Sequence, residues 1–580
     1  MKKQRFLPYR QSIPALLLYR IVSFLVLQGW LLALSGISRL ILRSAGRVAV
    51  TSGDLAFLFT SWQGILLVIL ALITLLIYFA VDINSLIILC DRLLNGQKPS
   101  VLYCVKEGFL SLRKFLNPIG FVVLIYLSVL SPVIGVGVSI SLTRNFYIPN
   151  FISSVIYGNP LYLTGFIILI IALALLGFFN LFILHGALLD NKKLFRSSKD
   201  SFRLVKSNFK TVFLSLLIFS AVMLLGALAM IALLAVLTVV YFVFKLPMVF
   251  ISVVLVTGFA VMLMVYSFAL PFLGLTVTKL YYRVNSVGEW EYTPRQKRKS
   301  PLVIVTVIAF VLLAALSATA LSAFADTTFP SKIRTTYIAH RAGGSEAPEN
   351  TAAGVDAAFK FGASGSEIDI QRTSDGYYVV NHDDSFKRVA GVDKTSSEMT
   401  LAEVKALRVG GEPVATFEEM LDSSRDRVTL FVELKGATAD KRMADDAVRI
   451  IKEKGMDEQA VIISLKYDLI EYIEDKYPDM LTGYLAFASF GDTAELSCDY
   501  IALEEESVRV ATVSEIHRNG KKLLVWTVND DSDIEDYLQI GADGIITDNI
   551  AAAQRIKEEL SQRSTAERLT DGITRLFFSE

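Results

Sequence analysis

The sequence predicts an α-helical membrane domain of several spans followed by a (β/α)8 barrel, an α/β fold of the TIM-barrel type. Two observations support this. Everything before about residue 326 is a series of long apolar runs, and everything after it has the mixed charge of a globular domain. From about Thr336, short β-rich runs alternate with helical stretches, as in parallel strands joined by helices. We expect a membrane domain over 1–326, a barrel over 331–565 and a C-terminal tail over 566–580.

The composition agrees with a membrane protein. The 580 residues are 53% hydrophobic and 19% charged, which is too apolar for an ordinary soluble chain. A net charge of +1 averages two unlike halves, so we expect no nucleic-acid partner. The cysteines are scattered without metal-ligand spacing, so no role for disulfides is expected. Nothing in the sequence identifies a protein partner.

Seven apolar runs are long enough to cross a bilayer core, which needs about 20 residues per helix. They centre on residues 15–38, 62–81, 118–142, 160–187, 211–244, 248–275 and 301–325. Lys245-Leu-Pro247 is the only break between the fifth and sixth runs, so a tight turn is expected there. Residues 48–60 are mildly apolar and could form an interfacial or re-entrant piece.

Charges beside these runs predict the orientation, because short cytoplasmic loops are enriched in Lys and Arg. The N-terminus and the connections after the second, fourth and sixth runs are basic. The alternate connections are poorer, although the first of them still carries Arg39, Arg43 and Arg47. We therefore expect a multi-pass protein of the cell membrane, with a cytoplasmic N-terminus and an extracytoplasmic barrel.

Two features of the membrane half have alternative interpretations. The last run ends in small residues, so it is either a plain membrane helix or an internal signal sequence with a cleavage site. The few ionisable residues within or beside the runs are Arg20, Asp82 and His185. Snorkelling or interfacial placement would explain them. A channel or carrier role for this half is a further alternative.

In the second half, eight runs are predicted to be barrel strands. They are Tyr337–His340, Ser366–Gln371, Val428–Leu434, Ala460–Leu465, Leu481–Phe487, Tyr500–Leu503, Lys522–Val528 and Gly544–Thr547. Amphipathic segments such as Thr351–Phe361 and Asp440–Lys454 lie between them. Eight strands separated by helices over about 230 residues have the size of a (β/α)8 barrel.

Catalytic groups of such a barrel stand at the carboxyl ends of its strands. Glu367 and Asp369 are two apart on the second strand, so the pleat directs both to the same face. The other groups at predicted strand ends or on nearby extended chain are His340, Glu433, Lys435 and His382. Imidazoles supply acid and base at neutral pH, and clustered carboxylates suit a hard divalent cation. This combination predicts a hydrolytic site.

These residues belong to motifs that run through the whole globular half. The motifs are His340-Arg341, Pro348-Glu-Asn-Thr351, Glu367-Ile-Asp369, Asp375-Gly376, His382-Asp383, Glu433-Leu-Lys435, Trp526-Thr-Val-Asn529, Gly541-Ala-Asp-Gly544 and Thr547-Asp548. In this order they resemble the glycerophosphodiester phosphodiesterase family, and the preceding spans resemble its membrane-anchored bacterial members. Two departures concern loop shape and specificity. Ala342 stands where glycine commonly follows His-Arg, and the segment 382–388 is a loose version of the usual one.

The resemblance implies a metal site. Its ligands would be Glu367, Asp369 and Glu433, whose hard oxygen donors suit Ca²⁺ or Mg²⁺ over Zn²⁺. We expect His340 and His382 to be the general acid and base, and the sequence leaves open which is which. The resemblance also suggests a first attack by the glycerol hydroxyl through a cyclic phosphate, which the residues do not decide.

For the other residues of the predicted site, the sequence allows two interpretations each. Arg341 and Lys435 would neutralise the phosphodiester, or form salt bridges to the metal-binding acids. Asn350 either stands at the helix entry as a structural group or faces the substrate. Trp526 either walls the alcohol pocket or packs in the core.

The resemblance implies hydrolysis of glycerophosphodiesters to glycerol 3-phosphate and an alcohol. The expected partners are a glycerophosphodiester or lysolipid substrate and the lipid bilayer. Phospholipase D-like hydrolysis of lysophospholipids is one alternative, and a non-catalytic phosphodiester sensor is another. Pure binding would not need two imidazoles and three carboxylates, which favours an enzyme.

Overall fold

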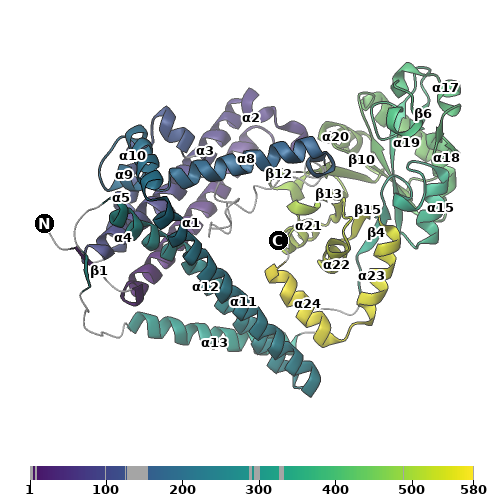
Figure 1. The fold of residues 1–580 in the computed structure, drawn as a ribbon. Helices are drawn as coiled ribbons and strands as arrows, with labels where there is room; N and C mark the ends of the chain where they lie inside the picture. Colours follow the sequence, from purple (N-terminus) through teal and green to yellow (C-terminus); the bar gives the residue numbers. More distant parts are fainter. Residues whose placement is uncertain are drawn as a thin grey trace. The chain divides into compact units, whose positions relative to one another are not determined.

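The computed structural model describes residues 4–6, 9–97, 100–123, 126, 155–285, 290–292, 301–324, 332–487 and 489–578 (Figure 1). The chain divides into two compact units. The helical unit comprises residues 1–38 and 64–324, and the barrel unit comprises 39–63 and 325–580. The connection between the first two apolar runs thus belongs to the barrel unit, although the sequence places it far from the barrel.

Helices of 6 to 37 residues form most of the helical unit. Their bounds are α1 Tyr9–Ser44, α3 Trp62–Tyr78, α4 Ser85–Leu94, α5 Val101–Ser111, α8 Pro160–Phe179, α9 Ile183–Leu188, α10 Leu194–Ser207, α11 Phe209–Phe244, α12 Met248–Val284 and α13 Pro301–Ala323. A π-helical turn, η2 Phe79–Asn84, joins α3 to α4. A parallel pair of short strands, β1 Gln4–Phe6 and β3 Trp290–Tyr292, completes the described part.

Five described stretches are long and apolar enough to cross a membrane. They are Ser12–Ser44, Trp62–Leu94, Pro160–Leu188, Phe209–Phe244 and Met248–Val284, and each contains one predicted run. The last predicted run forms α13. The run 118–142 lies largely outside the described residues. The expected turn is present, since α11 ends at Phe244 and Lys245 takes a left-handed φ of 48° before Pro247. The count of seven spans stays a prediction.

The three ionisable residues singled out in the helical unit have polar partners inside it. Arg20 Nη1 lies 3.3 Å from Asp82 Oδ1, and the Asp82 side chain is 1% exposed. His185 Nε2 lies 3.1 Å from the Thr278 hydroxyl. Snorkelling therefore does not explain Asp82 and His185, whereas their interfacial placement stays a prediction. Their polar groups are paired inside the unit, because burying them unpaired would be costly.

Eight parallel strands form the centre of the barrel unit. They are β4 Thr336–Ala339, β5 Gly365–Arg372, β9 Thr429–Leu434, β10 Ala460–Ser464, β11 Thr482–Ala486, β13 Tyr500–Glu504, β14 Lys522–Trp526 and β15 Gly544–Thr547. They pair in the order β4-β5-β9-β10-β11-β13-β14-β15, and β15 pairs with β4 to close the ring. The predicted barrel and all eight predicted strands are confirmed.

The alternation of strand side chains separates two kinds of core. Side chains such as Phe431, Ile463, Leu485 and Leu524 fill the interior of the ring. Their neighbours in sequence, such as Tyr484, point outward and pack beneath the helices. Both faces of every strand are therefore buried, as expected for a parallel sheet covered by helices.

Helices follow seven of the eight strands (Figure 1). They are α15 Ala352–Lys360 after β4, α16 Lys387–Ala390, α17 Leu401–Lys405 and α18 Phe417–Ser424 after β5, α19 Lys441–Glu453 after β9, α20 Tyr467–Lys476 after β10, α21 Val510–Arg518 after β13, α22 Asp531–Gln539 after β14 and α23 Ile550–Gln562 after β15. Most of the predicted tail lies in α24 Thr565–Phe578. Between β11 and β13, the described residues contain β12 Ser489–Gly491 and one 3-10 turn, with no α-helix.

The connection after β5 carries the second histidine of the predicted site. Its first element, β6 Tyr378–Val380, pairs antiparallel with the end of β5, so that Ile370 faces Val380. His382 follows β6 after one residue, Asn381, whose backbone N–H donates to the Asp369 carbonyl at 3.0 Å and holds the segment beside the carboxyl end of β5.

Candidate active site

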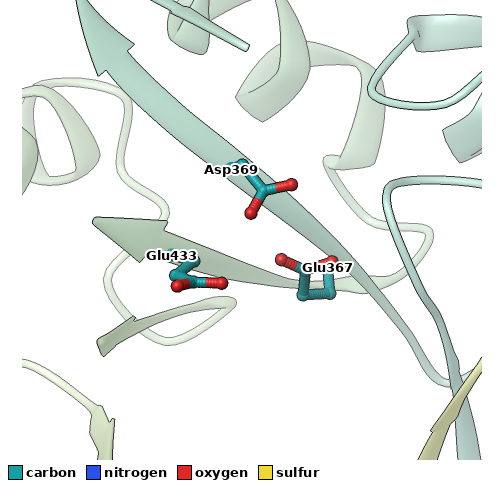
Figure 2. Close-up of side chains that lie close together, drawn as sticks. All are labelled: Glu367, Asp369 and Glu433. Carbon is teal, nitrogen blue, oxygen red and sulfur yellow. The ribbon is translucent and has the colours of Figure 1, made fainter. Parts of the chain in front are cut away.

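Three acidic side chains meet at the carboxyl ends of β5 and β9. Glu367 and Asp369 lie on one face of β5, and Glu433 is directly opposite Asp369 on β9. Figure 2 shows the three carboxyl groups projecting from the two strands into one space. One oxygen of each lies within 4.8 Å of the others, and the residues are 4%, 1% and 6% exposed. The period-2 pleat predicted this convergence.

A few polar groups hold these carboxylates in place. Lys435 Nζ lies 2.9 Å from Glu433 Oε2 and 3.3 Å from Asp369 Oδ1. The Asn350 amide donates to Asp369 Oδ2 at 2.9 Å and accepts from the Asp369 backbone N–H. The Arg341 backbone N–H donates to Glu367 Oε2 at 2.8 Å. Asp369 Oδ1 is buried and makes no hydrogen bond beside its ion pair with Lys435.

Crowding and burial change the acidity of the three groups in different directions. Burial raises the pKa of Glu367 well above its ordinary value, and the charges of Asp369 and Glu433 raise it further. Burial also raises the pKa of Glu433 to about 7. Burial acts in the same direction on Asp369, but Lys435, both imidazoles and the Asn350 hydrogen bond outweigh it, and the pKa of Asp369 falls to about 2.

The donor set fits a hard divalent cation. All the candidate ligand atoms are carboxylate oxygens, the donors that Ca²⁺ and Mg²⁺ prefer. Only one ammonium group faces three buried carboxyl groups, so it cannot compensate the charges of all three when they are ionised. Apart from its ion pair with Lys435, Asp369 Oδ1 lacks the hydrogen-bond donor that a buried carboxylate oxygen normally has. A cation among these oxygens would resolve both conditions.

His340 follows β4 and is oriented by a carboxylate from the neighbouring strand. Its Nδ1 lies 2.8 Å from Asp548 Oδ1, and Asp548 directly follows β15. The Asn529 amide donates to the other Asp548 oxygen at 2.7 Å. The hydrogen bond from His340 lowers the pKa of Asp548 against the opposing effect of burial. This contact fixes the imidazole ring and leaves Nε2 for proton exchange.

His382 is oriented in the same manner by the residue that follows it. Its Nδ1 lies 2.9 Å from Asp383 Oδ1. Arg388 donates to both Asp383 oxygens and pairs with Glu349 through two bonds of 2.6 and 2.7 Å. The Arg388 hydrogen bond lowers the pKa of Asp383 to about 2, and burial lowers the pKa of His382. The imidazole is therefore positioned by a chain of ion pairs.

The turn after β4 uses two residues in the left-handed conformation. Arg341 has φ of 48° and Ala342 has φ of 76°. Glycine adopts such values without strain, which accounts for the glycine that commonly follows His-Arg in the resembled family. Ala342 keeps the turn because it is fully buried and its N–H bonds the Glu367 carbonyl.

The remaining predicted residues have more structural contacts than expected. Lys435 forms the salt bridges to the acids that were its alternative interpretation. Asn350 contacts Asp369, while Thr351 caps α15 by accepting from the Gly354 N–H. Trp526 ends β14 and donates from Nε1 to the Ala502 carbonyl at 3.0 Å, partly exposed at the end of the interior core. Arg341 Nη1 reaches Glu349 at 3.5 Å.

The sequence interpretation missed the partners of both imidazoles. Asp548, Asn529 and Asp383 stood in the quoted motifs without an assigned role. Asp548 could have been found, since it follows the last strand and that strand pairs with the first in a closed barrel. Glu349 and Arg388 carry no comparable signal, because their pairing depends on how two loops meet.

The site thus has two oriented imidazoles beside three buried carboxyl groups, at the carboxyl end of a (β/α)8 barrel. This arrangement is typical of an enzyme that uses acid–base chemistry next to a cluster of acidic side chains. Residues 340–552 match the model of the glycerophosphoryl diester phosphodiesterase family. Residues 4–319, more than half of the chain, match that of the membrane domain of glycerophosphoryl diester phosphodiesterase. The chain belongs to this family. The predicted family and the prediction of an enzyme are confirmed.

Individual relatives cover the barrel half. A glycerophosphodiester phosphodiesterase of Caldanaerobacter subterraneus is 29% identical over 231 residues, which are 37% of this chain and 95% of the relative. One from Bacillus subtilis is 25% identical over 296 residues, which are 45% of this chain and 99% of the relative. Two solved structures are each 25% identical over 40% of this chain. One is a Parabacteroides distasonis glycerophosphodiester phosphodiesterase, 100% covered with a TM-score of 0.37. The other is an Oleispira antarctica phosphodiesterase in complex with sn-glycerol-3-phosphate, 99% covered with a TM-score of 0.36.

Proposed function

We propose that this protein hydrolyses glycerophosphodiesters to glycerol 3-phosphate and an alcohol with the help of a divalent cation. The observation that carries the proposal is the cluster of three buried carboxylates within 4.8 Å of one another, flanked by two imidazoles that are each oriented by a carboxylate. A binding protein for phosphodiesters would need neither the crowded acids nor the matched orientation of both rings.

Glu367, Asp369 and Glu433 would hold Ca²⁺ or Mg²⁺. A bound divalent cation supplies a Lewis acid that withdraws charge from a phosphoryl oxygen. The protein's own contribution is to keep the carboxylates fixed. Asn350 bonds Asp369, the Arg341 backbone N–H bonds Glu367, and Lys435 bonds Glu433, so each carboxylate is held by at least one polar group.

His340 and His382 are the proposed acid and base. Because Nδ1 of each ring is engaged by a carboxylate, Nε2 is the atom that exchanges a proton. One ring accepts a proton from the attacking hydroxyl, and the other donates a proton to the leaving alcohol oxygen. The attacking hydroxyl belongs either to water or to the glycerol moiety, and a cyclic phosphate would distinguish the second case.

Three other residues would act on the substrate. Lys435 stands between two of the acids and is the nearest fixed cation to a phosphoryl group bound there. Arg341 would add a second positive charge from the turn after β4. Trp526 lies across the ring from β5 and β9 in the strand order, a position suited to the alcohol portion. The positive charges of Lys435 and Arg341 would stabilise the negative charge that grows on the phosphoryl oxygens in the transition state.

We also propose that the protein is a multi-pass membrane protein with its N-terminus in the cytoplasm and its barrel outside. The support is the alternation of basic and poorer connections along the apolar runs. The arginines of the first connection weakened this alternation. Arg39 and Arg43 are paired with carboxylates of the barrel unit, which gives them a function other than cytoplasmic anchoring.

The test uses the purified full chain in detergent with glycerophosphocholine. Release of glycerol 3-phosphate should require Ca²⁺ or Mg²⁺ and stop with EDTA. Metal content after dialysis, measured by mass spectrometry, gives a second readout that does not depend on turnover. Release that EDTA leaves unchanged would contradict the cation. No release from glycerophosphocholine, but choline release from lysophosphatidylcholine, would favour the phospholipase D-like alternative.

A further inference from the structure

The barrel has a gap in its outer layer of helices. In the described residues, every strand of the ring except β11 is followed by at least one α-helix before the next strand of the ring. The described residues between β11 and β13 form only β12 and the 3-10 turn Thr493–Glu495. Tyr484 of β11 points outward into this gap and is fully buried. Some other part of the barrel unit must therefore cover it.

The covering segment comes from the start of the chain. Residues 39–63 belong to the barrel unit, and within them β2 Ala49–Thr51 pairs antiparallel with β12. The register places Val50 opposite Phe490 and Ala49 opposite Gly491. A further backbone bond runs from the Asp492 N–H to the Val48 carbonyl at 3.0 Å.

Side chains of the segment complete the core beneath it. Ala49 is 6% exposed and belongs to the same buried cluster as Tyr484, Leu496 and Cys498. The Tyr484 hydroxyl donates to the Thr51 hydroxyl at 2.5 Å. The segment therefore contributes both apolar and polar contacts to the layer that a helix covers elsewhere in the ring.

The contact is close at Gly491. This residue has φ of 112°, and a Cβ added to it would lie 2.6 Å from the Val48 carbonyl oxygen and 2.9 Å from both Ala49 Cα and Leu42 Cδ1. Leu42 itself, near the end of α1, is fully buried. No side chain fits between Gly491 and the segment, so the two backbones are in direct contact at this residue.

Two ion pairs extend the contact along the end of α1. Arg39 Nε lies 3.0 Å from Asp492 Oδ1, and Arg43 Nη2 lies 3.4 Å from Glu495 Oε2. Both arginines are half exposed or more, so each pair adds little alone. Together they align the end of α1 with the loop after β12, since two consecutive turns of the helix each contact one acidic residue of that loop.

We propose that residues 39–54 take the position of the missing helix and are an integral part of the catalytic barrel. The barrel is then assembled from two segments separated by the membrane domain, and residues after 325 alone do not complete its core. This inference goes beyond the proposed activity and does not depend on it. It also constrains the membrane topology, because the connection between the first two spans must lie on the same side of the membrane as the barrel.

The pairing restricts the number of membrane crossings. Between residues 63 and 325 the chain must cross an even number of times. Four of the long apolar stretches lie in this interval. If each of these four crosses, the apolar run 118–142 and the helix α13 must either both cross or both remain on one side. The seven-span arrangement predicted from the sequence satisfies this condition with six crossings.

Disulfide cross-linking tests the contact directly. Facing residues of an antiparallel pair have Cα atoms about 4.5–5.5 Å apart, within the range of about 4.4–6.8 Å that a disulfide spans. Val50→Cys with Phe490→Cys, in the full chain in native membranes, should give a linked peptide on mild oxidation. Val50→Cys with Phe359→Cys is the control, since Phe359 is similarly exposed on α15. Free thiols in the first pair, or equal linkage in both pairs, would overturn the proposal.

A pair of glycine substitutions tests the dependence of the barrel on the contact. Gly491→Ala places a methyl group against the segment, whereas Gly520→Ala, also at a positive φ of 72°, meets nothing within 4 Å. Both changes strain the backbone, but only the first should separate the segment. We expect Gly491→Ala to slow cross-linking of the cysteine pair at least tenfold and to lower the thermal midpoint more than Gly520→Ala. Equal effects of the two substitutions on both readouts would overturn the proposal.

Discussion

Two histidine–carboxylate pairs stand at opposite ends of the same strand, β15. At the amino end, His517 Nε2 lies 2.8 Å from Asp543 Oδ2. At the carboxyl end, His340 Nδ1 lies 2.8 Å from Asp548 Oδ1. The two contacts are alike in chemistry and in length. A pair of this kind therefore does not by itself identify a catalytic site.

Their surroundings differ. Asp543 also accepts the Leu523 backbone N–H, and its partner His517 is exposed on α21. The pair at the amino end of β15 therefore joins a helix to two strands. Asp548 is held by the Asn529 amide, and its histidine is close enough to help lower the pKa of Asp369. In such barrels, residues at the amino ends of the strands generally stabilise the fold, and residues at the carboxyl ends carry out the chemistry. The following predictions test whether this protein follows it.

The largest effect is expected from the acidic cluster. Asp369→Asn and Glu433→Gln should each lower turnover by about 10³-fold, because a lost ligand removes several kcal/mol of transition-state stabilisation. Added Ca²⁺ or Mg²⁺ should raise the thermal midpoint of the wild type but not of these variants, since only the native state binds the ion. Asp499→Asn is the control, because Asp499 accepts the Thr482 N–H at the amino end of β11. Normal turnover by either variant would show that the acidic cluster has no part in catalysis.

The next largest effect separates the two ends through their histidines. His340→Ala and His382→Ala should each lower turnover of glycerophosphocholine by about 10²–10⁴-fold, the usual contribution of general acid–base catalysis. His517→Ala should leave turnover near the wild-type value, since its ring pairs with Asp543 away from the acids. Steady-state rates of the purified full-length variants decide the matter. Equal losses in all three would mean that the histidines matter for folding rather than chemistry.

A smaller effect is expected from the carboxylates of the two pairs. Asp548→Asn keeps the shape of the side chain but weakens its hold on the His340 ring, and should lower turnover by about 10–100-fold, as when other imidazole-orienting partners are lost. It should also change the pH dependence of the rate, because the charge beside the imidazole is removed. Asp543→Asn, the matched change at the amino end, should alter only the thermal midpoint. If Asp543→Asn reduced the rate as strongly, the two ends would not differ as proposed.

The sequence predicted the barrel well, because its strands are short β-rich runs in regular order. Each of the eight predicted runs overlaps one strand of the ring. The pleat on β5 also predicted that Glu367 and Asp369 share a face. These features depend on residues close in sequence, whose pattern repeats with the period of the strand.

Contacts between distant segments could not be predicted in this manner. The partner of His340 is 208 residues away, and the partner of Tyr484 is 433 residues away. The strand β2 has only three residues, which is too short for a recognisable alternation. The mild apolarity of residues 48–60 indicated an interfacial or re-entrant piece, whereas part of that apolar surface is buried against the barrel. Hydropathy cannot distinguish a lipid from a protein partner.

The smallest expected effect concerns the side of the barrel, away from both ends. Tyr484→Phe removes the hydroxyl that bonds Thr51 and should lower the free energy of unfolding by about 1 kcal/mol, the net value of a typical hydrogen bond. Turnover should not change, because the contact lies in the outer layer and not among the interior side chains. Tyr472→Phe is the control, since its hydroxyl bonds Asp445 on the helical surface, where water can replace it. Thermal unfolding of both full-length variants would show a lower midpoint only for Tyr484→Phe. If the Tyr484 change reduced turnover instead, the segment 39–54 would influence the catalytic end as well as the side of the barrel, and the division between the two ends of β15 would be incomplete.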